Sequence, residues 1–371
     1  MIHALIILLP LLLLAPGLID LGQQQTLIAG SLFVIGSLIK DRVVRYFAYY
    51  AGVWIIFIRI MFTYIGFSRP QVPSATGQII FITLGLIVYH AAASGKYSKE
   101  SIYNAICITA LIQAFLGICQ FFGIRPLFEF YALFSKMRWP ENVSSYVCGS
   151  LRNPNFLSAY LAISIPFFFR RGWKYLIPLI IIPMLMAKSA GGIIAVMVGA
   201  SVYYGVYKKN FIPAGILLVV GIMTVWIMNG AENFTGNRVT LWWIPALKEI
   251  FSSKMAVIFG FGPGAPTVFT PNKSPLHNEW LQCWWYYGVI GFAAAVVYFF
   301  RFQRTDKIIY IAFIIASATM FVNYGMHIAP SAALMMVIMG MGERVKYGGL
   351  PDISEPDRRG SEGGKSNGRK H

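Results

Sequence analysis

Charged residues are scarce in this sequence, and acidic residues are the scarcer kind. Only 12% of its 371 residues are charged, against roughly 25% in soluble domains. Hydrophobic residues make up 57%, and they come in runs long enough to cross a lipid bilayer. The composition therefore excludes an ordinary soluble protein and predicts an all-α, polytopic membrane protein.

The sequence lacks the residue patterns of three common kinds of site: a disulfide framework, a metal site and a P-loop. Cys107, Cys119 and Cys283 fall in or beside apolar runs and only Cys148 lies in a loop, so no disulfide framework is indicated. The acidic residues form no paired carboxylates or His/Asp cluster, which argues against a metal site. GFGPG at 260–264 lacks the Lys-Ser/Thr of a P-loop. We expect neither a metal nor a cofactor.

Basic residues, in contrast, are abundant, and the net charge is +17. They are spread between the apolar runs instead of forming one basic patch. This spread is typical of topology signals and phosphate ligands, and it argues against a nucleic-acid partner. The expected surroundings are a lipid bilayer.

The hydropathy pattern predicts about 12 membrane spans. They lie near residues 3–19, 25–39, 46–66, 77–93, 102–123, 156–169, 175–187, 190–207, 211–228, 281–300, 308–323 and 325–340. Residues 1–342 then form one transmembrane domain. The tail at 343–371 is rich in Gly, Ser and charge, and we expect it to be disordered.

The placement of Lys and Arg predicts the orientation of the chain. With the N-terminus in the cytoplasm, every short inner loop is basic, and the C-terminal tail is also inside. The longer loops at 67–76, 124–155 and 229–280 lie on the opposite face, where basic residues are thinly spread. The loop at 229–280 interrupts the apolar pattern most strongly and is the predicted catalytic loop.

Arg238 precedes a segment in that loop, VTLWWIPALKEIF, with helical apolar spacing. We interpret this segment as an amphipathic helix in the outer membrane interface. A guanidinium at its start is suited to bind phosphate oxygens in a bidentate manner. The alternative is a snorkelling Arg that only anchors the helix.

His277 stands just before the span at 281–300, in the sequence SPLHNEW. Imidazole exchanges protons near neutral pH, which suits proton transfer from a sugar hydroxyl. The alternative is an interfacial His bonded to backbone. Glu279 is a spare candidate base, and Asn278 is a possible auxiliary residue. His327 is a weaker candidate near the last span.

Further candidates fall on the same predicted face. Arg59 lies toward the outer end of a span, where a charge is costly unless it faces the bundle interior or a headgroup. Glycines of the GFGPG turn offer backbone N–H groups to an anion, although a plain loop is the favoured interpretation. Asn155 is a candidate helix cap. The candidate phosphate-binding set is Arg59, Arg69, Arg152, Lys188, Gly262 and Gly264.

The order of these elements resembles the O-antigen ligase/polymerase superfamily of bacterial envelope glycosyltransferases. The matching pieces are LRNPNFLSAYLA after Gly149, the Ser-x-Gly-Gly element at 188–192, Arg238 with Trp242, GFGPG, and His277-Asn278 before Gly288 and Gly291. The resemblance covers roughly residues 150–300; the first 120 residues agree only in hydropathy. Many relatives carry Ser-Arg-Gly where this chain has Ser189-Ala190-Gly191, which leaves Lys188 as a possible substitute for the Arg.

The resemblance implies a metal-independent, inverting transfer of a glycan from an undecaprenyl diphosphate carrier, at the outer face of a bacterial cytoplasmic membrane. It implies that Arg238 binds the diphosphate and that His277 activates the acceptor hydroxyl. The acceptor is open among a glycan repeat, lipid A–core and a Ser of a protein. A secondary transporter of an anionic solute is the rival from another class.

Overall fold

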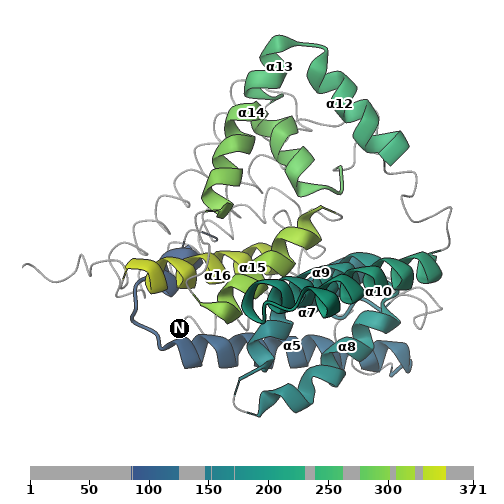
Figure 1. Ribbon diagram of the computed structural model, residues 1–371, viewed down its shortest axis with the longest axis vertical. Helices are drawn as coiled ribbons and strands as arrows, with labels where there is room; N and C mark the ends of the chain where they lie inside the picture. The colour runs from purple at the N-terminus through teal and green to yellow at the C-terminus, as the bar shows by residue number, and fades with distance from the viewer. Residues whose placement is uncertain are drawn as a thin grey trace, which may run out of the picture.

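The computed structural model describes residues 85, 87–124, 147–151, 153–170, 172–229, 239–261, 276–300, 306–321 and 329–347, and most of these are helical (Figure 1). No strand occurs among them, which confirms the all-α prediction for this part of the chain. The predicted spans before residue 84 lie outside the described residues. So does the tail from residue 348 onward.

Each predicted span from residue 102 onward coincides with a helix to within a few residues, except the last, where the span predicted at 325–340 corresponds to a helix at 329–347. The main bundle contains α5 (Lys99–Phe121), α7 (Pro154–Phe168), α8 (Ile177–Met186), α9 (Ala190–Val202), α10 (Phe211–Asn229), α15 (Lys307–Met320) and α16 (Ala329–Tyr347). A 3₁₀ turn at Trp173–Leu176 precedes α8, and a π-helical turn at Tyr203–Tyr207 follows α9. α16 continues past residue 343, where the tail was predicted to begin.

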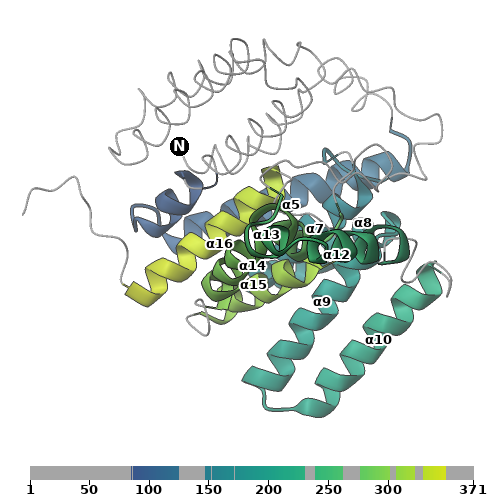
Figure 2. The same cartoon turned by 90° about the horizontal axis from the view of Figure 1, so that it is seen from above.

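α7 lies at the centre of this bundle because it is apolar around its whole circumference. Every residue from Leu157 to Phe168 is buried, as expected for a core helix and not for a surface helix with one apolar stripe. The helix packs against α5, α8, α9, α15 and α16. Figures 1 and 2 show it surrounded by these elements.

The helix ends follow from local capping chemistry. Ser98 caps α5 by accepting from the Ser101 amide at 3.1 Å, and Asp306 caps α15 in the same way. At α7 the cap is Asn153, which accepts from the Asn155 amide at 2.8 Å. The prediction that Asn155 caps this helix was therefore wrong. Pro154 takes the first helical position, where its missing N–H costs nothing.

Small residues allow the helices around α7 to approach one another closely. A Cβ added at Gly192 would overlap Ser158 of α7, and one at Gly199 would overlap Ile315 of α15. α9 and α10 lie side by side (Figure 2), with Gly221 against Met197. Such small-residue contacts are typical of helix packing in membranes, where van der Waals contact drives association.

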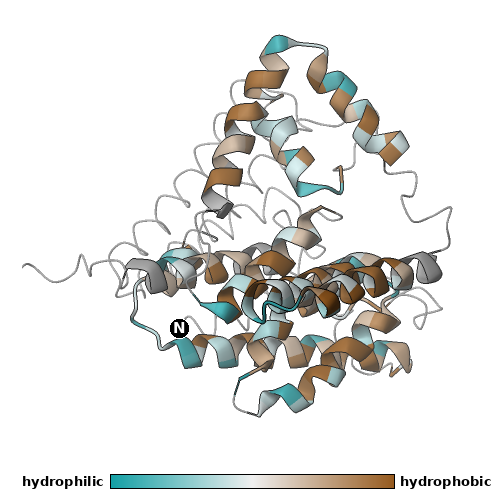
Figure 3. Ribbon diagram, in the orientation of Figure 1, coloured by the Kyte–Doolittle hydropathy of each residue, from teal (hydrophilic) through white to brown (hydrophobic). Residues whose placement is uncertain are grey.

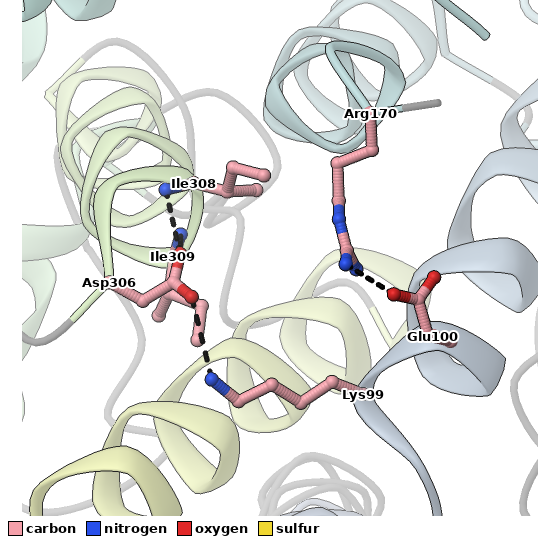
Figure 4. A network of polar contacts seen from close by, with 6 residues as sticks. All are labelled: Lys99, Glu100, Arg170, Asp306, Ile308 and Ile309. Carbon is pink, nitrogen blue, oxygen red and sulfur yellow. Dashed lines mark hydrogen bonds and ion pairs between the residues drawn. The ribbon is translucent and has the colours of Figure 1, made fainter. Parts of the chain in front are cut away.

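Two ion pairs tie one end of the bundle (Figure 4). Lys99 Nζ lies 3.4 Å from Asp306 Oδ2, and the Arg170 guanidinium bonds Glu100. These pairs join the start of α5 to the start of α15 and to the turn after α7. Three loops that the positive-inside rule assigned to the cytoplasm therefore meet at one end.

The outer surfaces of several helices are apolar. On α10 the side chains of Phe211, Ile212, Ile216, Val219 and Ile222 are all more than half exposed. Figure 3 shows hydrophobic residues over most of α8 and α10. Soluble monomers rarely expose apolar patches of this size. By length and composition, Lys99–Phe121 and Ala190–Tyr207 are each sufficient to cross a membrane.

A second, smaller unit is built from the residues around the predicted catalytic loop and lies above the bundle in Figure 1. It contacts the bundle where the Trp280 ring lies 5.9 Å from that of Phe321, the residue that follows α15. It contains a π-helical turn at Val239–Trp243, α12 (Ile244–Phe251), α13 (Lys254–Phe259) and α14 (Glu279–Phe300). Its core consists of Ala246, Ile250, Leu276, Leu281, Trp285 and Tyr286. The segment predicted as an amphipathic helix is thus helical, with Ala246 and Ile250 facing inward.

Two glycines join α13 to α14 backbone against backbone. Gly260 has φ 73° and ψ −168°, and Gly288 has φ 64° and ψ −169°, a region essentially restricted to glycine. A Cβ on Gly260 would lie 2.6 Å from the Gly288 amide nitrogen. The Phe261 amide donates to the Trp285 carbonyl at 2.8 Å. Gly288 also kinks α14 at this contact.

We expect Gly288→Ala to destabilise the protein by about 1–3 kcal/mol or more, since Ala must adopt a strained backbone there and its Cβ would overlap Ile258. Thermal unfolding of the detergent-solubilised protein measures the change. Gly215→Ala is the matched control, because Gly215 lies within α10 with open space around it. Equal unfolding temperatures for wild type and Gly288→Ala would contradict the docking described.

Candidate functional site

His277 lies in the short turn that leads into α14. Its backbone has φ 52°, in the left-handed region that a non-glycine residue rarely occupies. Its ring stacks on Trp242 with centroids 4.8 Å apart and planes inclined by 27°. The side chain is half-buried. The imidazole is therefore held in one orientation by both its backbone and its ring contact.

The turn around His277 is fixed by hydrogen bonds on both sides. Trp243 Nε1 donates to the Leu276 carbonyl at 2.9 Å, and the Leu276 amide donates to Gln282 Oε1 at 2.8 Å. Asn278 caps α14 by accepting from the Leu281 amide at 3.0 Å. The bonds connect the turn to α14 and to the π-helical turn ahead of α12. Hydrogen bonds on both sides therefore fix the backbone of the His277 turn.

Asn278 and Glu279, the two predicted auxiliary residues, are both 8% exposed. The carboxamide of Asn278 is used in the cap, which gives this residue a structural role. Glu279 is the first residue of α14, where a carboxylate is stabilised by the positive end of the helix dipole. Asn278 directly follows His277, and Glu279, two positions on, is the nearest acidic residue along the chain.

Arg238 lies shortly before Trp242, the residue on which His277 stacks, but it is outside the described residues. The π-helical turn begins at Val239, and Trp242 follows Arg238 by four positions. The structure thus brings the His277 turn against the segment that Arg238 precedes. The contact between Trp242 and His277 was not predicted from the sequence, in which they lie 35 positions apart.

The glycine-rich motif has a demonstrated structural use at its first position. Gly260 ends α13 and docks on Gly288, as described above. The tight turn predicted for the motif as a whole stays a prediction. Gly262 and Gly264, the two predicted anion-binding positions, lie outside the described residues.

A second group of predicted residues meets where α7 begins and α8 passes into α9. Ser189 Oγ donates to Asn155 Oδ1 at 2.8 Å, and Ser158 Oγ reaches the Ser189 carbonyl at 3.5 Å. The Asn-Pro-Asn element and the Ser-x-Gly-Gly element therefore pack together. Lys188 precedes Ser189 with φ 50° and an exposed side chain. Arg152 lies outside the described residues, as do Arg59 and Arg69 earlier in the sequence.

Two buried glutamines of α5, which were not among the predicted site residues, hold the loop before α7. Gln120 Oε1 accepts from the Cys148 and Gly149 amides at 2.8 and 2.7 Å, and its Nε2 donates to the Gly149 carbonyl. Gln113 exchanges bonds with Ser150. The signal available in the sequence was two uncharged polar residues seven apart in an apolar span, which places both on one helix face.

No family model, curated protein or solved structure matches the chain.

The arrangement around His277 suits proton transfer more than ligation of a metal. Among the described segments, no group of three or more His, Cys, Asp or Glu side chains converges. What the geometry offers is one imidazole, stacked on an indole and fixed in direction by its support. An oriented imidazole of this kind can accept a proton from a hydroxyl placed within hydrogen-bond distance.

We expect Gln120→Leu to release the loop before α7, because it leaves two buried amides unsatisfied at about 1–3 kcal/mol each. Cys148, which is 1% exposed, should then react with a maleimide. Labelling kinetics measure this in a variant whose remaining cysteines, Cys107, Cys119 and Cys283, are replaced by alanine.

Thr224→Val is the control for this experiment, since the Thr224 hydroxyl is exposed on α10 and bonds only its own helix. Its Cys148 labelling should match that of the parent. Unchanged protection of Cys148 in Gln120→Leu would show that the glutamine clamp does not hold the loop.

Proposed function

We propose that the chain is a polytopic membrane glycosyltransferase of the O-antigen ligase/polymerase type. In this proposal about 12 helices span the bilayer. The apolar side chains exposed along α8 and α10 support burial in lipid. The small-residue contacts of α9 with α7 and α15 support helix packing within a membrane.

The two ends of the bundle support the proposed orientation. Lys99, Arg170 and Asp306 meet at one end, which contains the basic loops proposed to be cytoplasmic. Asn155 and Ser189 meet at the ends of α7 and α9 that lie away from those loops. Lys188 belongs to this second end, on the proposed outer face of a bacterial cytoplasmic membrane.

The observation that carries the function is the His277 turn. A stacked, half-buried imidazole in a strained backbone conformation is held next to the segment that follows Arg238. Strained conformations persist where the surroundings over-determine them, and they are concentrated at active sites. A scaffold role would leave this arrangement without a purpose.

The proposed reaction is transfer of a glycan from undecaprenyl diphosphate to an acceptor hydroxyl. His277 accepts the proton of that hydroxyl, and the oxygen attacks the anomeric carbon as the bond to the diphosphate breaks. The configuration at carbon is inverted. Arg238 stabilises the charge that develops on the leaving diphosphate, with Lys188 and the predicted cations Arg59 and Arg152 as auxiliaries. No metal takes part in the proposed mechanism.

The proposed acceptor is another glycan repeat or lipid A–core, which corresponds to a polymerase or a ligase. Transfer to a Ser of a protein uses the same chemistry at the same site and is the alternative. The three acceptors differ in what binds beside His277, and gel analysis of the products distinguishes them.

We expect His277→Ala and Arg238→Ala each to reduce glycan transfer by a factor of roughly 10² or more, the usual contribution of a general base or an oxyanion-stabilising group. Membrane insertion and expression should be unchanged. The test is complementation of hosts that lack either the O-antigen polymerase or the ligase, each supplied with a matched repeat unit, with products resolved on glycan gels.

His90→Ala is the matched control for this test, because His90 lies in another helix, outside the predicted catalytic loop. It should restore the same product as wild type. Full activity in both the His277 and Arg238 variants would refute the assignment of the site. Failure of wild type to rescue either host, with expression confirmed, would count against both preferred acceptors and leave protein glycosylation or anion transport.

The orientation has its own test in single-cysteine variants. In a background with all four native cysteines replaced, we expect Lys188→Cys to react with a membrane-impermeant maleimide in spheroplasts. Lys174→Cys should react only after the membrane is permeabilised. Both side chains are exposed in the structure, so accessibility to the reagent reports the membrane side. The opposite labelling pattern would invert the proposed topology.

A further inference from the structure

A cavity of about 270 Å³ lies at the bundle end opposite Ser189, beside the Arg170–Glu100 pair. Its lining comes from the first turns of α5, the end of α7 and the turn before α8. Arg170 and Glu100, which border it, appear in Figure 4. The lining residues are Glu100, Tyr103, Asn104, Cys107, Phe167, Arg170 and Trp173. The cavity is separate from the proposed transfer site.

Two hydrogen-bond donors in this lining are buried and unused. Tyr103 is 3% exposed, and its hydroxyl has no hydrogen-bond partner among the residues that the structure describes. Within the same residues, Arg170 Nη1 is also buried without a partner, while Nη2 bonds Glu100. A buried donor left unsatisfied costs about 1–3 kcal/mol, so a ligand that accepts from both would remove a real penalty.

The geometry brings these two donors to one place. The Arg170 guanidinium lies over the Tyr103 ring, 4.6 Å from its centroid, and Tyr103 packs edge-on against Phe167 at 5.0 Å. The guanidinium is thus fixed by the Glu100 bond on one side and by the aromatic ring beneath it. Arg170 Nη1 and the Tyr103 hydroxyl are thus two buried donors carried by side chains that line the cavity.

The charge around the cavity favours an oxyanion. Lys99 and Lys174 adjoin the lining in sequence, and Lys307 lies at the start of α15 beside Asp306. Glu100 and Asp306 are each already paired with a basic residue. A guanidinium with a free N–H edge and an adjacent hydroxyl is a common arrangement for binding phosphate.

The surroundings also provide apolar surface for a lipid. Phe169 and Tyr175, which follow α7 and precede α8, are 67% and 76% exposed, and Leu179 is exposed on α8. Acyl chains could follow this surface while the headgroup occupies the cavity. In the proposed topology this end of the bundle lies at the cytoplasmic membrane face, where negatively charged lipid attracts basic groups.

We propose that the cavity between Tyr103 and Arg170 binds the phosphate group of a membrane phospholipid at the cytoplasmic face. The Tyr103 hydroxyl and Arg170 Nη1 donate to the phosphate oxygens, and the exposed apolar side chains of α8 contact the acyl chains. The lipid source depends on the proposed membrane topology, whereas the phosphate site depends only on the described residues.

The test is native mass spectrometry of the full chain in detergent, titrated with phosphatidylglycerol and with diacylglycerol of the same acyl chains. Phosphatidylglycerol should bind and diacylglycerol should not. Tyr103→Phe removes one donor and keeps the ring under the guanidinium, so we expect it to weaken phosphatidylglycerol binding roughly tenfold. Tyr204→Phe, at an exposed tyrosine outside both the lining and the proposed acyl-chain surface, is the matched control and should bind like wild type.

Glycerol 3-phosphate, titrated alone, distinguishes the two sources of phosphate. Binding as tight as that of phosphatidylglycerol would keep the phosphate site and overturn the lipid source. Equal binding of diacylglycerol and phosphatidylglycerol, or an unchanged affinity in Tyr103→Phe, would overturn the site itself. The assay contains no glycan donor, and His277→Ala should bind lipid normally. Failure of the lipid proposal is therefore distinguishable from failure of the proposed transfer reaction.

Discussion

The constraint on which this structure depends is that backbone polar groups next to apolar surroundings must find partners inside the protein. The loop before α7 meets it with side chains, because Gln120 alone bonds both the amide and the carbonyl of Gly149. α7 can then begin at a defined place, with Asn153 as its cap. The position of Asn155 against Ser189, and so the placement of Lys188, follows from that start.

The unit around α14 solves a related problem with glycine. Gly260 and Gly288 let two backbones touch, so that the Phe261 amide reaches the Trp285 carbonyl. With α13 held this way, α12 and its preceding turn pack over the beginning of α14. Trp243 then reaches Leu276, and Trp242 covers His277. The direction of the imidazole is therefore a consequence of contacts made well away from it.

Hydropathy predicted the long apolar helices among the described residues, because it depends on residues close in sequence, but it did not predict the short helix α13. The span predicted at 211–228 is the helix Phe211–Asn229, and Asp306 is a cap of the expected kind. The choice of Asn153 over Asn155 needed the actual helix start. The contacts of Gln120 with Cys148 and of Trp242 with His277 join segments 28 and 35 residues apart, which spacing alone does not reveal.

Two polar sites among the described residues lie at helix ends, and they are built differently. At the Arg170 end the charges are paired and fixed against an aromatic ring, which suits holding a ligand in place. At the His277 turn one half-buried imidazole stacks on Trp242, and its backbone at φ 52° costs folding free energy. Glycine at this position would avoid the cost of a positive φ but would carry no imidazole. The positive φ of His277 indicates a catalytic role only if the surrounding hydrogen bonds and the Trp242 stack serve to orient the imidazole. If they served only to stabilise the turn, the strain would have no function.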